Sequence, residues 1–254
     1  MRCEQDGAVA RLTLARPERL NALSIALTSD LIAALVRLEE DERVRSVVLT
    51  GEGRGFCSGA DLADAAERVS GGGAAERLAY MRTHERLVTA MRESRLPIVA
   101  ALSGPVYGAG WSVALACDLI VASADARFCQ VFVKRGLVPD LGSAWLLPRA
   151  VGALRARELM LLGEEITAEE AFSLGLVNRL LETPQQALEV AGELASRLSD
   201  APVATMAMAK SLMNGSEHGP LSDSIRAEQL MQAIALGTEE SLTALRAFLD
   251  RRRS

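Results

Sequence analysis

Two alanines and one aspartate stand at positions where backbone and side-chain chemistry could meet. Ala60 and Ala109 each have glycine neighbours and lie where an apolar strand pattern has ended and a helix can begin. Small residues there let a substrate carbonyl approach free backbone N–H groups, and two such donors form an oxyanion hole. Asp140 is the only carboxylate in the Pro-Asp-Leu-Gly-Ser turn before a helix that begins near Ser143. We therefore expect Ala60, Ala109 and Asp140 to share one active site.

Histidine, nucleophile and metal chemistry have little support in the sequence. Only His84 and His218 are present, and we expect both at the surface, on a charged helix face and in a turn. Ser58 and Ser112 have no evident histidine base, which argues against a nucleophilic triad. The four cysteines show no Cys-x-x-Cys spacing, so the sequence indicates neither a zinc site nor a disulfide framework.

The residues alone leave two interpretations of Asp140. A carboxylate between Pro139 and Leu141 could act as a general base, and it could equally be an N-terminal cap for the helix that follows. Asp61 directly follows a candidate donor, whereas the position of Asp118 after a small-residue helix is typical of a turn or cap residue.

Composition excludes several classes of protein. The 254 residues are about half apolar, enough to bury a full core, and a formal net charge of −5 argues against a nucleic-acid binder. The arginines at 251–253 are expected to form a solvated tail. No stretch approaches ~18 apolar residues and the N-terminus lacks a signal-type run, so we expect no membrane span and a reduced, cytoplasmic location.

Strand and helix patterns alternate and then give way to helices alone. Strands are expected at residues 8–14, 44–50, 98–102, 119–122 and 176–181, and helices after Ser24, at 74–93, after Ser143, and after the capping residues Thr167 and Thr183. Residues 63–73, which end in Ser-Gly-Gly-Gly, are expected to be mobile. The order predicts an α/β core over residues 1–200 and a helical region over residues 201–254.

Several motifs, in order, resemble the crotonase (enoyl-CoA hydratase/isomerase) superfamily over nearly the whole chain. RPERLNAL at 16–23 resembles its first CoA-contact motif, and FCSGADL at 56–62 resembles the motif that carries the first oxyanion donor. Residues 104–118 resemble the motif of the second donor. Matches to the later core and to the C-terminal helix signature follow at 164–171, 175–177 and 247–252.

This resemblance implies a spiral of ββα turns with a helical C-terminal region that packs trimers, often as dimers of trimers. It implies an acyl-CoA thioester as substrate, no metal or redox cofactor, and the N–H groups of Ala60 and Ala109 as the oxyanion hole. It also implies substrate or CoA contacts from Arg19, Ala22, Ser58, Asp61, Leu62, Phe132, Phe248 and Arg251. Arg251 would reach the site from a neighbouring subunit.

The departures from the family pattern bear on the reaction. Family hydratases carry two glutamates, and Ser112 and Phe132 stand at those positions here. Asp140 stands where hydratases usually have glycine, which is similar to epoxyphenylacetyl-CoA isomerases and Δ3,Δ2-enoyl-CoA isomerases. A similarly placed aspartate is the nucleophile of chlorobenzoyl-CoA dehalogenases.

A proton shift by one base fits these residues better than hydration does. Hydration must activate water and protonate the α-carbon, which is easier with two carboxylates. A 1,3-proton shift needs one base beside an oxyanion hole, and burial against Phe132, Leu137 and Leu141 would raise the pKa of Asp140 usefully. We therefore expect an acyl-CoA isomerase. A hydratase or lyase, a dehalogenase or thioester hydrolase, and a catalytically weak acyl-CoA-binding homologue stay open as alternatives.

Overall fold

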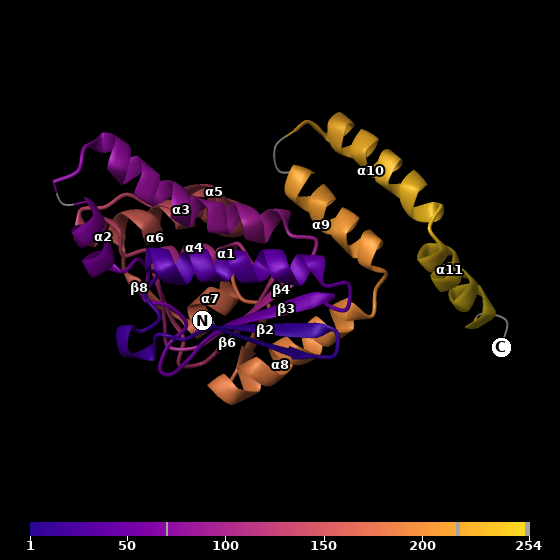
Figure 1. The fold of residues 1–254 in the computed structure, drawn as a ribbon, viewed down its shortest axis with the longest axis horizontal. Coiled ribbons are helices and arrows are strands. Elements are labelled where there is room, and N and C mark those ends of the chain that lie inside the picture. Colours follow the sequence, from indigo (N-terminus) through magenta and orange to yellow (C-terminus); the bar gives the residue numbers. More distant parts are fainter. Residues whose placement is uncertain (70, 217–218, 252–254) are drawn as a thin grey trace.

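A computed structural model describes residues 1–69, 71–216 and 219–251, in which strands alternate with helices before a final run of helices (Figure 1). The strands are β1 (Arg2–Asp6), β2 (Val9–Leu14), β3 (Ser46–Gly51), β4 (Ile98–Leu102), β5 (Pro105–Tyr107), β6 (Leu119–Ser123), β7 (Arg127–Cys129), β8 (Glu165–Thr167) and β9 (Arg179–Leu181). The helices of the core are α1 (Ile25–Glu40), α2 (Leu62–Val69), α3 (Ala74–Glu93), α4 (Ala109–Leu115), α5 (Ser143–Val151), α6 (Ala153–Leu162), α7 (Ala168–Ser173) and α8 (Pro184–Ser199). Helices α9 (Val203–Ser216), α10 (Leu221–Leu236) and α11 (Glu239–Arg251) follow.

The strands form two sheets. The larger sheet has the order β1-β2-β3-β4-β6-β9 and is parallel except for the antiparallel pair β1-β2. The smaller sheet has the order β5-β7-β8, with β7 and β8 antiparallel. Strand β1 was not expected, because all of its residues are exposed at the sheet edge and give no apolar pattern. The predicted strand at 176–181 is shorter than expected and begins only at Arg179.

Helices cover both faces of the larger sheet, as Figure 1 shows for α1 and α3 on one side and α8 on the other. On the α8 side, Ala187, Ala191 and Ala195 pack against residues that include Val48 and Val121. Burial on both faces explains why the central strands read as continuous apolar runs. The carboxyl ends of these strands lead into the loops that carry the candidate site.

Helix α2 shows that the prediction of a mobile segment at residues 63–73 was wrong over most of its length. The side chain of Asp61 accepts hydrogen bonds from the N–H groups of Ala63 (3.2 Å) and Asp64 (3.3 Å), which caps the first turn. The glycines that suggested mobility come only after the helix has ended. Residue 70 lies outside the described residues.

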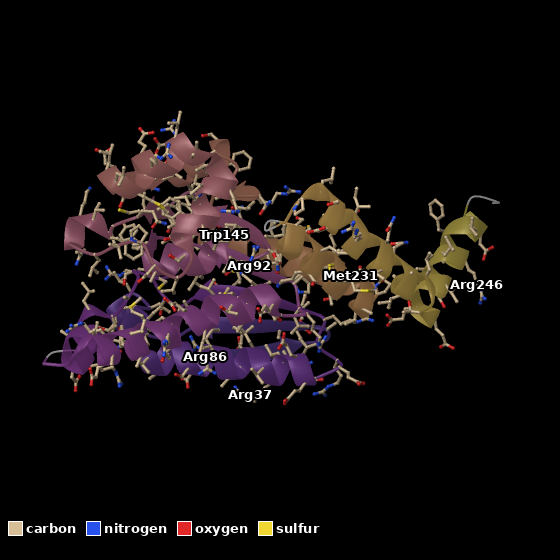
Figure 2. All side chains as sticks on the ribbon, turned by 90° about the horizontal axis from the view of Figure 1, so that it is seen from above. Arg37, Arg86, Arg92, Trp145, Met231 and Arg246 are labelled. Atoms are coloured by element: carbon tan, nitrogen blue, oxygen red, sulfur yellow. The ribbon has the colours of Figure 1, made fainter. Side chains whose placement is uncertain are left out.

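Of the C-terminal helices, α9 packs on the core, whereas α10 and α11 extend from it and α11 contacts it through the Arg45–Glu240 ion pair (3.6 Å). The Lys210 side chain on α9 is 3% exposed, and its Nζ donates to the carbonyls of Met91 and Leu96 (3.0 Å each) and to Asp118 (2.8 Å). Helices α10 and α11 extend away as an arm, and Figure 2 shows Met231 and Arg246 on it. The division at residues 200 and 201 stays a prediction.

The arm exposes large apolar side chains on both of its helices. They are Leu221, Ile225, Leu230, Ile234, Leu236, Leu242, Leu245, Phe248 and Leu249. In the part of the chain that the structure describes, no helix combines the length and apolar character needed to cross a membrane.

Candidate active site

The segments that carry Ala60 and Ala109 run side by side in the same direction. Cys57 and Val106 form a parallel β-bridge, after which the second segment turns at Gly108 into helix α4. The two segments are still close at that point, because a Cβ on Gly59 would lie 3.6 Å from the Ala109 amide nitrogen. The fold therefore brings the two predicted donors together from loops about fifty residues apart in the chain.

Both amides are left without a protein acceptor by the local backbone pattern. Leu23 pairs with Ala60 by donating to Gly59 (2.8 Å) and accepting from Asp61 (3.0 Å), so the Ala60 N–H points away from Leu23. Ala109 is the first residue of α4, where an N–H has no acceptor inside the helix. Within residues 1–69, 71–216 and 219–251, neither N–H donates to another protein group. Their role as oxyanion donors stays a prediction.

Two glycines make this close approach possible. Gly108 has φ 48° and ψ −120°, a conformation that a residue with a Cβ strongly disfavours. A Cβ on Gly110 would lie 2.5 Å from the carbonyl oxygen of Cys57 and 2.8 Å from its sulfur. The first turn of α4 can therefore lie against the 57–60 segment only because these positions are glycine.

Asp140 lies beside the same helix. The Ser112 hydroxyl, one turn after Ala109, donates to the backbone carbonyl of Asp140 (3.1 Å). The cap interpretation of Asp140 was wrong, because Gly142 occupies the N-cap position of α5 and no side chain caps that helix.

The surroundings of Asp140 favour its protonated form. Its Oδ1 is buried and has no partner among the described residues. Burial, and secondly the charge of Glu85, raises the pKa of Asp140 to about 7. Phe132 and Leu141 are buried as expected, whereas Leu137 is 46% exposed and contributes less than predicted.

The structure corrects the surface position predicted for His84. This side chain is 2% exposed, its Nδ1 lies 2.8 Å from the Thr28 hydroxyl, and its ring packs edge-on against Tyr80 with centroids 4.8 Å apart. Charged neighbours on α3 obscured this, yet His84 shares a face with the buried Leu87 and Met91. The helical spacing of residues 84, 87 and 91 is the sequence feature that could have predicted the burial of His84. His218 lies outside the described residues.

Arg16 and Arg19, which belong to the N-terminal motif, line a second cleft. Arg19 is exposed and lines a cleft of about 530 Å³ together with Asp61 and Arg16. Arg16 contacts Asp61 (2.9 Å) and donates to the Ala22 carbonyl (2.7 Å). Burial raises the pKa of Asp61, but the hydrogen bond and charge of Arg16 and the backbone N–H groups of Asp64 and Ala63 hold it below its ordinary value. Asp61 is therefore an ionised residue that supports the loop, and sequence reasoning missed Arg16 as its partner.

The other predicted contact residues divide by position. The Ser58 hydroxyl donates to the Arg19 carbonyl (3.4 Å), and Leu62 is 44% exposed at the start of α2. Phe132 lies next to Gly108, because a Cβ added to Gly108 would lie 3.6 Å from the Phe132 ring. Phe248 is exposed on α11, far from α2 and α4 (Figure 1), and the side chain of Arg251 lies outside the described residues.

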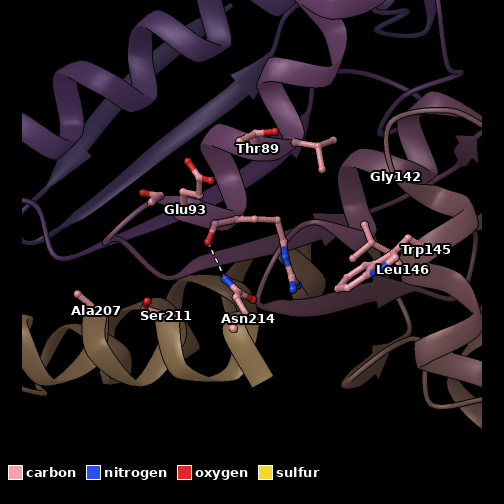
Figure 3. A pocket seen from close by; sticks show the side chains of 12 residues that line it. Thr89, Glu93, Gly142, Trp145, Leu146, Ala207, Ser211 and Asn214 are labelled. Atoms are coloured by element: carbon pink, nitrogen blue, oxygen red, sulfur yellow. Dashed lines mark hydrogen bonds between the residues drawn. The ribbon is translucent and has the colours of Figure 1, made fainter. Parts of the chain in front are cut away.

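A separate cleft of about 550 Å³ lies between α3, α5 and α9 (Figure 3). Trp145 lines it, and the Asn214 side chain donates to the Arg92 carbonyl (2.6 Å) across it. None of the predicted site residues lines this cleft, although Gly142 at its edge is close in sequence to Asp140. It is the junction between α9 and the core.

Comparison with known proteins agrees with this geometry. The family described as enoyl-CoA hydratase/isomerase matches residues 4–254. The 1,2-epoxyphenylacetyl-CoA isomerase of Escherichia coli K12 is 34% identical over 96% of this chain and 93% of its own length. The solved enoyl-CoA hydratase of Polaromonas sp. JS666 superposes with a TM-score of 0.92 at 32% identity, over 98% of this chain and 96% of its own. The solved enoyl-CoA hydratase of Mycobacterium smegmatis gives a TM-score of 0.91 at 30% identity, over 98% of this chain and 95% of its own. The chain belongs to the enoyl-CoA hydratase/isomerase family and has the crotonase fold.

Proposed function

We propose that this protein is an acyl-CoA isomerase that shifts a double bond, or opens an epoxide, through a thioester enolate. In the double-bond shift, the Asp140 carboxylate removes a proton from the substrate carbon next to the thioester carbonyl. The electron pair moves onto the carbonyl oxygen, which the N–H groups of Ala60 and Ala109 hold. The protonated Asp140 then returns the proton to a different carbon of the acyl chain.

The observation that carries this proposal is the buried carboxyl of Asp140, a residue whose backbone accepts a hydrogen bond from Ser112 on α4, the helix that begins at Ala109. A raised pKa of about 7 makes Asp140 a stronger base than an ordinary carboxylate, and it can still be ionised at neutral pH. Each oxyanion-hole donor contributes about 3–4 kcal/mol of transition-state stabilisation in comparable systems. The proposed reaction needs only these groups of the chain and no cofactor besides the CoA carried by the substrate.

Buried groups at the two positions of the hydratase glutamates support isomerisation over hydration. Ser112 is fully buried and its hydroxyl donates to the carbonyls of Gly108 (3.2 Å) and Asp140 (3.1 Å). Phe132 is 4% exposed and apolar. Neither can act as a carboxylate base. The E. coli relative named above is itself an isomerase by name.

Hydration is the second candidate, and Glu85 is the observation that favours it. The charge of Glu85 acts on Asp140 from helix α3, so a second carboxylate is near the proposed base. The solved relatives named above are hydratases by title. If Glu85 activates water, Glu85→Gln should abolish hydration of 2-enoyl-CoA and leave double-bond isomerisation within about threefold of the wild-type rate.

Incubation with three CoA thioesters tests the proposed function. The protein is mixed separately with a 3-enoyl-CoA, a 2-enoyl-CoA and an aryl-epoxide CoA, and the products are identified by mass spectrometry. Interconversion of the enoyl isomers without a 3-hydroxy product supports the isomerase. A 3-hydroxyacyl-CoA as the main product would support the hydratase, and binding without turnover would support an acyl-CoA-binding homologue. In a separate incubation with a halogenated aryl-CoA, formation of an aspartyl ester would support a dehalogenase.

We further propose a cytoplasmic homotrimer or dimer of trimers, in which the arm of α10 and α11 packs on a neighbouring subunit. The apolar side chains that the arm exposes support this assembly. Arg19 would contact CoA phosphates from within the subunit, and Phe248 and Arg251 would reach the nucleotide end from the neighbour. Arg19→Glu should then raise KM far more than it lowers kcat.

A further inference from the structure

Two buried polar groups on α3 have no use in the proposed proton shift. The Tyr80 hydroxyl and the Nε2 of His84 are both buried, and neither has a hydrogen-bond partner among the described residues. The residues are one turn apart on the same face of the helix, and their rings are in contact. A buried polar group left unpaired costs about 1–3 kcal/mol, so this pair calls for a ligand.

The hydrogen bond of His84 to Thr28 fixes which ring nitrogen carries the proton. The Thr28 side chain is fully buried, and within the described ranges its hydroxyl bonds only to the Nδ1 of His84 (2.8 Å). The hydroxyl proton has no other acceptor, so Thr28 donates to Nδ1 and the proton of the neutral ring lies on Nε2. His84 therefore presents a free N–H donor.

Both groups remain neutral donors at physiological pH. Burial lowers the pKa of His84, and burial followed by the charges of Asp64 and Asp61 raises the pKa of Tyr80 to about 12. Helix α3 packs against α4, which begins at Ala109, and a Cβ on Gly142, two residues after Asp140, would lie 3.8 Å from Val88 on α3. The charge of Asp140 also acts on Tyr80. None of these carboxylates accepts a hydrogen bond from Tyr80.

We propose that Tyr80 O–H and His84 Nε2–H together bind an oxygen atom carried by the acyl group itself, so that the protein selects oxygenated acyl-CoA thioesters over hydrocarbon ones. This inference rests on the proposed action on acyl-CoA thioesters. The thioester oxygen is assigned to Ala60 and Ala109, and Asp140 acts on the carbons that follow it. An oxygen near Tyr80 therefore belongs to C2, C3 or C4, as a hydroxyl, ketone or epoxide oxygen.

Such a site discriminates mainly against the ligand that lacks the oxygen. A hydrocarbon chain would leave both donors as unpaired as they are in the free protein, whereas an oxygenated chain would gain hydrogen bonds from both. The same donors would tolerate any oxygen acceptor of suitable position. The selectivity should therefore be for the presence of oxygen and not for one functional group.

Calorimetric binding of saturated thioesters tests the inference without any turnover. Hexanoyl-CoA is compared with its 2-, 3- and 4-hydroxy derivatives on the wild-type protein, on Tyr80→Phe and on Tyr107→Phe. Tyr80→Phe removes only the hydroxyl. Tyr107→Phe removes the hydroxyl of the other tyrosine, which bonds to Glu165 outside the proposed pair, and is the matched control.

We expect the wild type and Tyr107→Phe to bind at least one hydroxy derivative about tenfold more tightly than hexanoyl-CoA, as two neutral hydrogen bonds predict. Tyr80→Phe should lose most of this preference and keep its affinity for hexanoyl-CoA within about twofold. Equal binding of all four thioesters, or a preference that survives Tyr80→Phe, would overturn the inference and leave the proposed isomerase intact. Failure to bind any of the thioesters would overturn both.

Discussion

At the scale of single residues, the surroundings of Asp140 determine the pH at which it can accept a proton. Its carboxyl is half-buried, its Oδ1 has no partner among the described residues, and Glu85 adds a like charge. Burial and the charge of Glu85 both raise the free energy of the ionised form, which makes it a stronger base but lowers the stability of the fold when Asp140 is ionised. The same feature therefore affects catalysis and stability in opposite directions.

The pH dependence of isomerisation should report this carboxyl. Asp140 must be ionised to act as a base, so kcat/KM for a 3-enoyl-CoA should fall tenfold per pH unit below about pH 7. Glu85→Gln removes the neighbouring charge and should move this acid limb to lower pH. An acid limb near pH 4 in the wild type, typical of an exposed carboxyl, would contradict the assignment.

The pH dependence of folding should report it as well. The folded-state pKa of Asp140, about 7, lies above the unfolded value near 3.9, so its contribution to stability is lost as pH rises from about 4 to 7. Asp140→Asn cannot ionise, so it should unfold with a larger free energy than the wild type above pH 7, by up to about 4 kcal/mol. Urea unfolding at pH 5, 6, 7 and 8 measures this gap, which should grow up to pH 7 and then level off. A gap that stays the same from pH 5 to 8 would refute the raised pKa.

At the scale of elements, the contact between α4 and the 57–60 segment aligns the two amides. Gly110→Ala would place a methyl group 2.5 Å from the Cys57 carbonyl oxygen and force the two segments apart. We expect it to lower the free energy of unfolding by about 1–3 kcal/mol, as overpacking does, and to reduce turnover at least tenfold.

A glycine within α8 provides the control for this change. Gly192 lies inside the helix, and a Cβ there meets no atom within 4 Å. Gly192→Ala should therefore stabilise the fold by about 0.5–1 kcal/mol and leave turnover unchanged. Thermal unfolding and a 3-enoyl-CoA assay of both variants provide the comparison. Equal turnover in Gly110→Ala and wild type would show that the alignment does not matter.

How far the sequence predicts these elements depends on whether local chemistry or tertiary contact decides them. Helix α1 was predicted from leucines spaced along one face. The starts of α7 and α8 were predicted from Thr167 and Thr183, whose side chains bond to nearby backbone amides. Strand β1 was missed because its pairing depends on β2 and on none of its own apolar residues.

The candidate site shows the same limit. Glycine spacing pointed to Ala60 and Ala109, which the fold brings together from separate loops. The burial of His84 depends on packing against α1, which helix spacing indicates only when charged neighbours are set aside. The sequence alone did not decide whether Asp140 or Gly142 would take the N-cap position of α5. In the structure Gly142 takes it, and the Oδ1 atom of Asp140 has no partner among the described residues.

At the scale of the whole molecule, one buried ion pair holds the C-terminal helices to the core. Lys210 is almost fully buried, and Asp118 accepts from both Lys210 (2.8 Å) and the Ile98 amide (2.7 Å). Lys210→Met would leave Asp118 and two carbonyls without this cation. Because removal of one partner of a buried pair costs about 3–5 kcal/mol, urea unfolding should show a loss of this order, reduced where Asp118 is solvated. A loss below 1 kcal/mol would show that α9 is held by other contacts.

The arm should determine the oligomeric state. Light scattering is expected to give three or six times the chain mass of 27.1 kDa for the wild type. Ile234→Glu, which charges an exposed apolar position on α10, should lower this mass towards the monomer. Val36→Glu changes an exposed apolar residue on α1 and should leave the mass unaltered. A monomeric wild type at micromolar concentration would contradict the proposed trimer.

The most direct test of the central claim is the turnover of Asp140→Asn with a 3-enoyl-CoA. This change keeps the shape of the side chain and removes its ability to take a proton. Isomerisation should fall by about 10²–10⁴-fold, although the protein still folds to the same structure and keeps its affinity for a saturated acyl-CoA. Asp61→Asn, at the carboxylate that supports the loop, should reduce turnover less. An Asp140→Asn protein that isomerises the substrate at the wild-type rate would contradict the role of Asp140 as the base.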